Sequence, residues 1–198
     1  AYPFSNPQVA ADGSLIVYHS DGGSTTIEDT VASWAIRSGS GYADQGEIVT
    51  DPALKGYGDT GLQVAGEGNR IAAVWVRQKD HITKDAGEEL TNEDILLMNN
   101  SAEIMASIYD GSTWTTHQLT NNRNPDVAPV VSVDDGKVFV AYRSVYSSNL
   151  ANPLDFSESD SIVYTVYDMA SGQWSDAETV YNGTNGTVMG LSSEILGD

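Results

Sequence analysis

Five side chains in polar segments are the best candidates for contacting a ligand. His19, Arg77 and Arg143 come just after an aromatic residue near the end of a β-prone run, and all three can donate hydrogen bonds to an anionic or hydroxyl-rich ligand. Tyr57, in "KGYGD", and Tyr146, in "RSVYSS", could stack on a sugar ring. Two alternatives stay open: each basic residue pairs with a nearby carboxylate, and each tyrosine is a local packing anchor.

Catalytic and metal-binding residues cannot be selected from the sequence, and we assign none. A glycosidase needs two carboxylates about 5 to 10 Å apart, and the chain has 28 Asp and Glu residues among which nothing singles out a pair. The nucleophile-elbow, H-E-x-x-H, phosphate-loop and dinucleotide motifs are absent from the sequence. The three histidines show no metal-ligand spacing, and His117 is expected to be solvent-exposed on an outer strand.

We predict no cofactor, although a structural calcium ion stays open because of two acidic runs. These runs, "DAGEELTNED" at 85–94 and "DFSESD" at 155–160, do not follow the pattern of a dedicated calcium loop.

The composition excludes several classes of partner. The formal net charge of −19 repels phosphate backbones, so we predict no nucleic-acid partner. No apolar run approaches the roughly 20 residues that cross a bilayer, so we predict no membrane insertion. Hydrophobic residues make up 40% of the chain, which is enough for a real core, and the absence of cysteine rules out a disulfide-stapled scaffold.

A repeat of about 60 residues organises the chain. Each unit holds four short runs rich in Val, Ile, Tyr and Trp, joined by Gly-containing hairpin signals such as "ADGS", "DDGK" and "DGST". The predicted units cover residues 8–49, 62–120 and 129–181, and residues 182–198 are expected to begin a further unit. One helical turn or two is expected within residues 85–98.

These units predict an all-β fold. Runs such as "IAAVWV" and "VFVAY" are almost continuously apolar, which indicates strands buried on both faces. Four antiparallel strands per unit, covered on both sides, are typical of a β-propeller blade. We therefore predict a β-propeller segment of about three four-stranded antiparallel blades plus the start of a fourth. A β-sandwich is the alternative.

Loop lengths predict where a ligand would bind. Because antiparallel strands alternate in direction, the first-to-second and third-to-fourth turns share one end of the sheets, and all other connections share the opposite end. The first set is short, whereas the second set is long and spans residues 19–30, 50–60, 77–102, 121–128 and 144–160. Binding usually involves long loops on a rigid scaffold, so we expect any ligand at that end.

The segment "SIYDGSTW" resembles the Asp-box hairpin of sialidase-type propellers, roughly S-x-D-x-G-x-x-W. Ser107, Gly111 and Trp114 match this spacing, Asp110 lies one residue late, and residues 165–174 are a weaker copy. The chain also resembles secreted bacterial surface and lectin-like propellers. In the sialidase family the Asp-box is structural and lies away from the catalytic face.

The catalytic set of the sialidase family does not carry over to this chain. That family uses three arginines that clamp a carboxylate, a Tyr–Glu pair and an aspartic acid. Arg37, Arg70 and Arg123 are further candidates for the clamp, but Arg37 and Arg70 fall at or near the short turns.

Together these observations predict an extracellular binding or adhesion module, secreted or at the cell surface, whose partner is a glycan or another surface ligand. The alternatives are part of a sialidase-superfamily glycoside hydrolase, with its catalytic residues elsewhere, and a structural scaffold. Because three blades do not close a ring, we also expect self-association or contact with missing blades.

Overall fold

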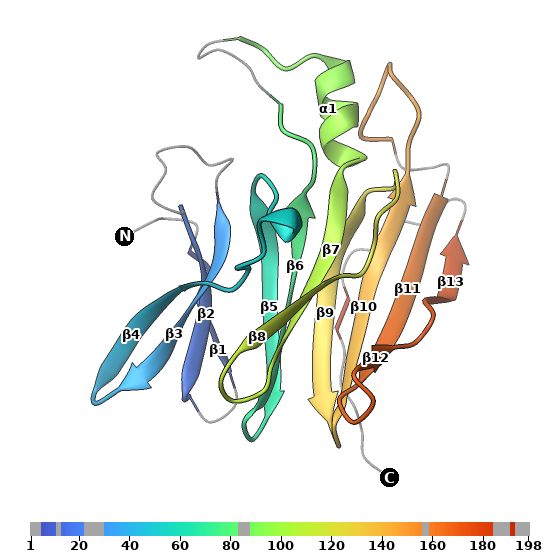
Figure 1. Ribbon diagram of the computed structural model, residues 1–198. Coiled ribbons are helices and arrows are strands. Elements are labelled where there is room, and N and C mark those ends of the chain that lie inside the picture. The colour runs from blue at the N-terminus through green and yellow to red at the C-terminus, as the bar shows by residue number, and fades with distance from the viewer. Residues whose placement is uncertain are drawn as a thin grey trace.

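The computed structural model describes residues 5–10, 13–21, 30–82, 88–155, 159–183 and 191–192. Its strands form three antiparallel sheets that follow one another along the chain (Figure 1). We call these sheets blade 1, blade 2 and blade 3. Within these residues no helix is both long and apolar enough to span a membrane.

In each blade, the first four strands lie in the sheet in the order in which they occur in the sequence. Blade 1 contains β1 (Gln8–Ala10), β2 (Leu15–Ser20), β3 (Val31–Ser38) and β4 (Gly41–Glu47). Blade 2 contains β5 (Asp59–Glu67), β6 (Arg70–Gln78), β7 (Ala102–Tyr109) and β8 (Trp114–Gln118). Blade 3 contains β9 (Asp126–Asp134), β10 (Lys137–Tyr146), β11 (Ser159–Asp168), β12 (Gln173–Trp174) and β13 (Glu178–Gly183).

The outermost strand of blade 3 is in two pieces, because β12 and β13 pair with successive parts of β11. β13 ends at Gly183, slightly beyond the expected end of the third unit. Most of the segment expected to begin a fourth blade, 184–190 and 193–198, lies outside the described residues. The chain is thus a β-propeller segment with three blades.

Blade 2 is buried on both faces, as the continuous apolar runs indicated. Successive side chains of a strand point to opposite faces. Ile71, Ala73 and Trp75 of β6 therefore belong to the core shared with blade 1, whereas Ala72 and Val74 belong to the core shared with blade 3. All five are at most 1% exposed. Two stacked sheets have no such middle layer, so the sandwich alternative is wrong.

Aromatic clusters fill both boundaries between blades. Between blades 1 and 2, Trp34 lies 5.4 Å from Tyr109 and 6.0 Å from Trp114, measured between ring centroids. The tilted pair of Tyr109 and Trp114, 5.1 Å apart, recurs in blade 3 as Tyr167 and Trp174, also 5.1 Å apart. Trp114 and Trp174 are therefore packing residues.

At the boundary of blades 2 and 3, His117 packs against Tyr167 at 5.5 Å and Trp174 at 6.0 Å. The expected solvent exposure of His117 is therefore wrong, because the next blade covers the outer strand that carries this residue. Burial lowers the pKa of His117, since desolvation disfavours the charged imidazolium.

The hairpin "YDGSTW" closes through its aspartate. Asp110 Oδ1 accepts hydrogen bonds from the backbone N–H groups of Ser112 and Thr113, both at 2.8 Å. These bonds lower the pKa of Asp110 to about 2. Asp168 Oδ1 closes the matching turn of blade 3 by accepting from the N–H of Ala170 at 2.8 Å. The hairpin has a structural role, as the Asp-box resemblance implied.

Long connections emerge at one end of the blades, and short turns lie at the other (Figure 1). The connection from β6 to β7 carries α1 (Asn92–Asn99), within the segment expected to form a helical turn. A capping box begins this helix: Thr91 accepts from the N–H of Asp94, and the Asp94 carboxylate accepts from the N–H of Thr91. Asn92 and Asn99 donate to the carbonyls of Leu150 and Pro153, which joins α1 to the long connection of blade 3.

The first strands of blades 2 and 3 share a bulge near their beginning. The register between β5 and β6 shifts after Thr60, and the register between β9 and β10 shifts at the matching place. The residue in the left-handed region at this point is Gly61 in blade 2, with φ of 65°, and Ala128 in blade 3, with φ of 52°. Alanine is strained there, whereas glycine is not.

We expect Ala128→Gly to raise the free energy of unfolding by about 0.5–1 kcal/mol, because the relief of left-handed strain exceeds the entropy that glycine adds to the unfolded chain. The matched control is Gly61→Ala, whose added Cβ would meet only Val76 at 3.8 Å and Pro129 at 3.9 Å. Gly61→Ala should lower the free energy of unfolding by a similar amount. Urea unfolding measures both changes, and a destabilised Ala128→Gly variant would contradict the assignment of strain.

Candidate functional site

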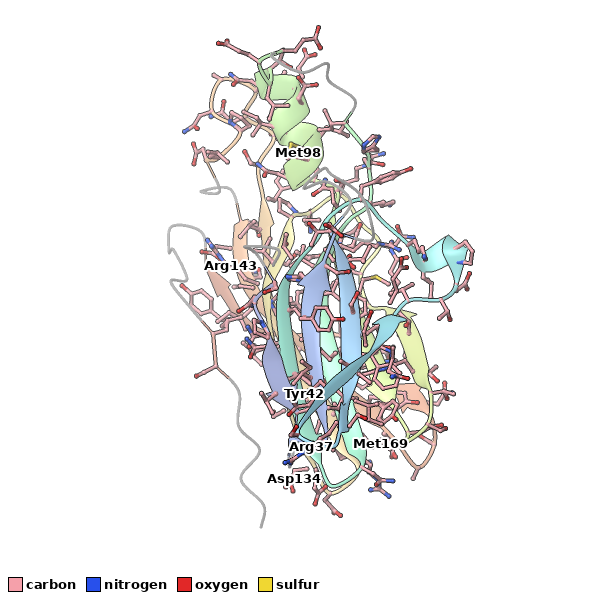
Figure 2. The ribbon with its side chains drawn as sticks, turned by 90° about the vertical axis from the view of Figure 1, so that its left-hand side faces the viewer. Arg37, Tyr42, Met98, Asp134, Arg143 and Met169 are labelled. Carbon is pink, nitrogen blue, oxygen red and sulfur yellow. The ribbon has the colours of Figure 1, made fainter. Side chains whose placement is uncertain are left out.

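All five ligand candidates from the sequence lie at the long-connection end. His19 is near the end of β2, Arg77 near the end of β6, and Arg143 and Tyr146 lie toward the end of β10. Tyr57 lies in the connection from blade 1 to blade 2. Figure 2 shows Arg143 well above Asp134, the last residue of β9, and Met169, which both lie toward the short-turn end. The structure separates these five residues into buried and exposed groups.

Arg143 is bound by a carboxylate of its own blade. Its Nε and Nη2 donate to Asp160 Oδ1 and Oδ2 at 2.7 and 3.0 Å. Asp160 lies in the neighbouring strand β11 and is 1% exposed. This two-point ion pair is the internal alternative that the sequence left open, and it occupies the face of the guanidinium that would otherwise bind a carboxylate.

Arg77 is buried and fixes a connection. Its Nη1 donates to the carbonyl of Leu54 at 2.6 Å, in the segment that joins blade 1 to blade 2. A Cβ on Gly56 would lie only 2.2 Å from Arg77 Cγ, so the segment crosses directly over this side chain. Burial lowers the pKa of Arg77, and the negative charges of Asp59 and Glu103 partly offset this decrease. The guanidinium therefore has a structural role in this arrangement.

Asp59 ties blade 2 to blade 1 at the same place. It is the first residue of β5 and lies opposite Arg77 in the register of β5 and β6. Its Oδ2 accepts from the N–H of Ala32 at 2.9 Å, and its own N–H donates to the carbonyl of Thr30 at 2.7 Å. Burial raises the pKa of Asp59 to about 7, although the bond from Ala32 and the charge of Arg77 both lower it.

A buried pair of carboxyl groups, Glu103 and Asp126, fixes the connection from blade 2 to blade 3. Glu103 Oε1 accepts from the N–H of Asn122 at 2.9 Å, and Asp126 Oδ2 accepts from Asn122 Nδ2, also at 2.9 Å. Lys79 Nζ lies 3.9 Å from Glu103 Oε1. Burial raises the pKa of both carboxyl groups, and the charge of Asp126 adds to the rise at Glu103.

Sequence analysis missed these buried carboxyl groups, although a repeat signal marks one of them. "NPQVA" at 6–10 recurs as "NPDVA" at 124–128, so Asp126 takes the place of Gln8 at the beginning of a first strand. Asp59 begins the corresponding strand of blade 2. Alignment of the first strands would have identified Asp59 and Asp126, but not Glu103, which lies in β7.

The two tyrosines are the exposed members of the candidate set. Tyr57 is 43% exposed and Tyr146 is 38% exposed. The ring of Tyr57 stacks on His81, with 4.5 Å between ring centroids and 23° between planes. Its backbone N–H donates to the carbonyl of Gln78 at 2.7 Å, which fixes this exposed ring to blade 2. His19, by contrast, is only 5% exposed.

A sialidase-type arginine clamp is not formed by the arginines weighed for it. Arg37 ends β3 and Arg70 begins β6, so both lie at the short-turn end (Figure 2 labels Arg37). Arg123 lies in the connection from β8 to β9 at the opposite end. Within the described residues no group of three His, Asp or Glu side chains could hold a metal ion. Residues 85–87 and 156–158, which belong to the two acidic runs considered for calcium, lie outside the described part.

Comparisons with known proteins give low similarity throughout. No protein-family model matches the chain, and no curated protein sequence matches it. Among solved structures, an alpha-L-arabinofuranosidase from Lactobacillus brevis is 13% identical, with 85% of this chain and 52% of that chain covered and a TM-score of 0.41. A xylan beta-1,4-xylosidase from Bacillus halodurans C-125 is 11% identical, with 92% of this chain and 34% of that chain covered and a TM-score of 0.48.

A third solved structure is the alpha-L-arabinanase of Penicillium chrysogenum complexed with arabinobiose. It is 13% identical, with 81% of this chain and 44% of that chain covered and a TM-score of 0.42. The chain thus spans between about a third and a half of the length of these three proteins. Similarity at this level assigns no activity.

Arg143→Ala tests the structural role of the Asp160 pair. Removal of Arg143 takes the two-point ion pair away from the Asp160 carboxylate, which is 1% exposed, so we expect a loss in the free energy of unfolding of up to about 3–5 kcal/mol in chemical denaturation. The double variant Arg143→Met with Asp160→Leu should recover most of the lost stability. An Arg143→Ala variant as stable as the parent would refute this role.

Asp59 predicts a pH dependence of stability. Its pKa in the folded protein is about 7, above the value of about 3.9 in the unfolded chain. The unfolded chain therefore loses this proton first as pH rises, so stability falls between about pH 4 and pH 7, by up to about 4 kcal/mol. Asp59→Asn keeps the oxygen that accepts from Ala32 and should flatten this part of the curve. Urea unfolding over that pH range measures it, and an unchanged slope in the variant would contradict the assignment.

Proposed function

We propose that this chain is a carbohydrate-binding segment of an extracellular β-propeller, secreted or displayed at the cell surface, which holds its glycan at the long-connection end. The observation that carries the proposal is Tyr57, an exposed ring fixed by its stacking on His81 and by its backbone bond to Gln78. The apolar C–H face of a sugar stacks on such a ring. A ring that is already fixed loses little conformational entropy on binding.

The surroundings of Tyr57 support this location. The connection that carries it is fixed from below by Arg77, whose guanidinium binds the Leu54 carbonyl. Tyr146 gives a second exposed ring at the same end, on blade 3. Binding on elaborated loops of a rigid scaffold is the usual arrangement. His19, Arg77 and Arg143 do not belong to the proposed surface, since His19 and Arg77 are buried and Arg143 pairs with Asp160.

A glycoside hydrolase segment is the second candidate. The observation in its favour is that burial raises the pKa of Asp59, Glu103 and Asp126 at the long-connection end, and a carboxylic acid with a raised pKa can donate a proton near neutral pH. However, each of these carboxylates accepts a hydrogen bond from an inter-blade contact, which favours a structural role for them. Binding is therefore the better-supported function.

A glycan array with the intact chain tests the proposal. We expect at least one glycan to bind, and Tyr57→Ala to weaken that binding about three- to tenfold through the lost stacking. Tyr42→Ala is the matched control, because Tyr42 is similarly exposed at 44% but lies at the short-turn end (Figure 2). Absence of any bound glycan would favour a structural scaffold, and hydrolysis of aryl glycosides would favour the second candidate.

A further inference from the structure

A groove of about 490 Å³ lies between blades 2 and 3 at the short-turn end. Its polar lining comes from Asn69 and Arg70 at the beginning of β6, Asp110 at the end of β7 and Thr115 in β8. Blade 3 contributes the region around Tyr167 in β11. A volume of several hundred Å³ is in the range of small-molecule sites, and it accommodates one or two sugar rings.

The groove offers hydrogen-bonding capacity that the protein does not use. Within the described part of the chain, the guanidinium of Arg70 has neither a hydrogen bond nor an ion pair, so its five N–H donors are available. Asp110 Oδ1 accepts three bonds at 2.8 Å within its turn, from the N–H and hydroxyl of Ser112 and the N–H of Thr113. Asp110 Oδ2 accepts only a long bond of 3.4 Å, from Thr113 Oγ1.

Two turn glycines leave the space that two of these side chains, Asn69 and Arg70, occupy. A Cβ on Gly111 would lie 3.1 Å from Asn69 Nδ2, and a Cβ on Gly136 would lie 3.0 Å from Arg70 Nη1. Gly136 belongs to the turn between β9 and β10, so Arg70 reaches from blade 2 across the boundary onto blade 3. Both side chains therefore lie directly against a backbone that carries no side chain of its own, which keeps the groove open between them.

We propose that this groove is a second binding site, specific for a neutral saccharide. Arg70 and Asp110 place donors and an acceptor in the lining of the same groove, and these match the hydroxyl groups of a sugar, each of which both donates and accepts. An anionic ligand is disfavoured because the bonds of its turn keep Asp110 ionised, with a pKa of about 2, and because the chain carries a net charge of −19. The exposed tyrosines at the long-connection end take no part, so this site stands independently of the proposed function.

Nuclear magnetic resonance titration of the intact ¹⁵N-labelled chain tests the proposal. The probes are the neutral trisaccharides maltotriose, mannotriose and xylotriose, with trigalacturonate as the acidic comparator. We expect one neutral trisaccharide to shift the backbone amides of residues 67–70 and 109–111. Arg70→Ala should weaken that binding about tenfold, as expected for lost hydrogen bonds to a charged group. Tyr57→Ala should leave it unchanged.

The same titration can overturn the proposal in three ways. The first is that no neutral trisaccharide shifts the groove amides. The second is that shifts occur only around Tyr57 and Tyr146, which would support the proposed function and refute the groove. The third is tighter binding of trigalacturonate than of every neutral probe. The amide spectrum of Arg70→Ala shows directly whether the variant is folded, and Asn69→Ala gives an independent substitution in the same groove.

Discussion

A four-stranded sheet that is apolar on both faces must be covered on both faces, and the rest of this structure depends on that requirement. Blade 2 meets it by lying between blades 1 and 3, with alternate residues of β6 in each of the two cores. Burial of apolar area is the main favourable contribution to folding. The aromatic clusters around Trp114 and Trp174 are the widest parts of this packing, and they recur because each boundary between blades must be filled in the same way.

The same stacking creates the buried charges. When blades lie face to face, each connection to the next blade must cross over strand ends and satisfy its backbone donors there. Glu103 accepts from Asn122 in the connection from blade 2 to blade 3, and Asp59 accepts from Ala32 in β3 where blade 2 meets blade 1, so carboxylates supply acceptors at both places. Their burial raises their pKa values. A group of ionisable residues at one end of the molecule thus follows from the architecture, and it need not be a catalytic centre.

Exposed apolar side chains lie at both outer blades, including Val9 of β1 and Val180 of β13, which are 62% and 63% exposed. Self-association, or contact with further blades, remains a prediction from the sequence that the same covering requirement motivates. The two binding sites that we propose, in contrast, use features that the packing leaves unused. These are the fixed ring of Tyr57 at one end and the Arg70 groove at the other.

Sequence alone determined the architecture, because hydrophobic periodicity and turn chemistry are local properties that a repeat reinforces. The apolar run "IAAVWV" predicted a strand covered twice, and the glycine-containing turns separated short connections from long ones. Tertiary structure decided which polar side chains are free. Arg143 and Arg70 look alike in sequence, yet one binds Asp160 and the other lies over Gly136 in an open groove. The difference arises because the partner of a charged side chain depends on which segments the fold brings within about 3 Å of it. Arg143 and Asp160, 17 positions apart, meet only when β10 pairs with β11, and Arg70 reaches Gly136 only when blades 2 and 3 pack together.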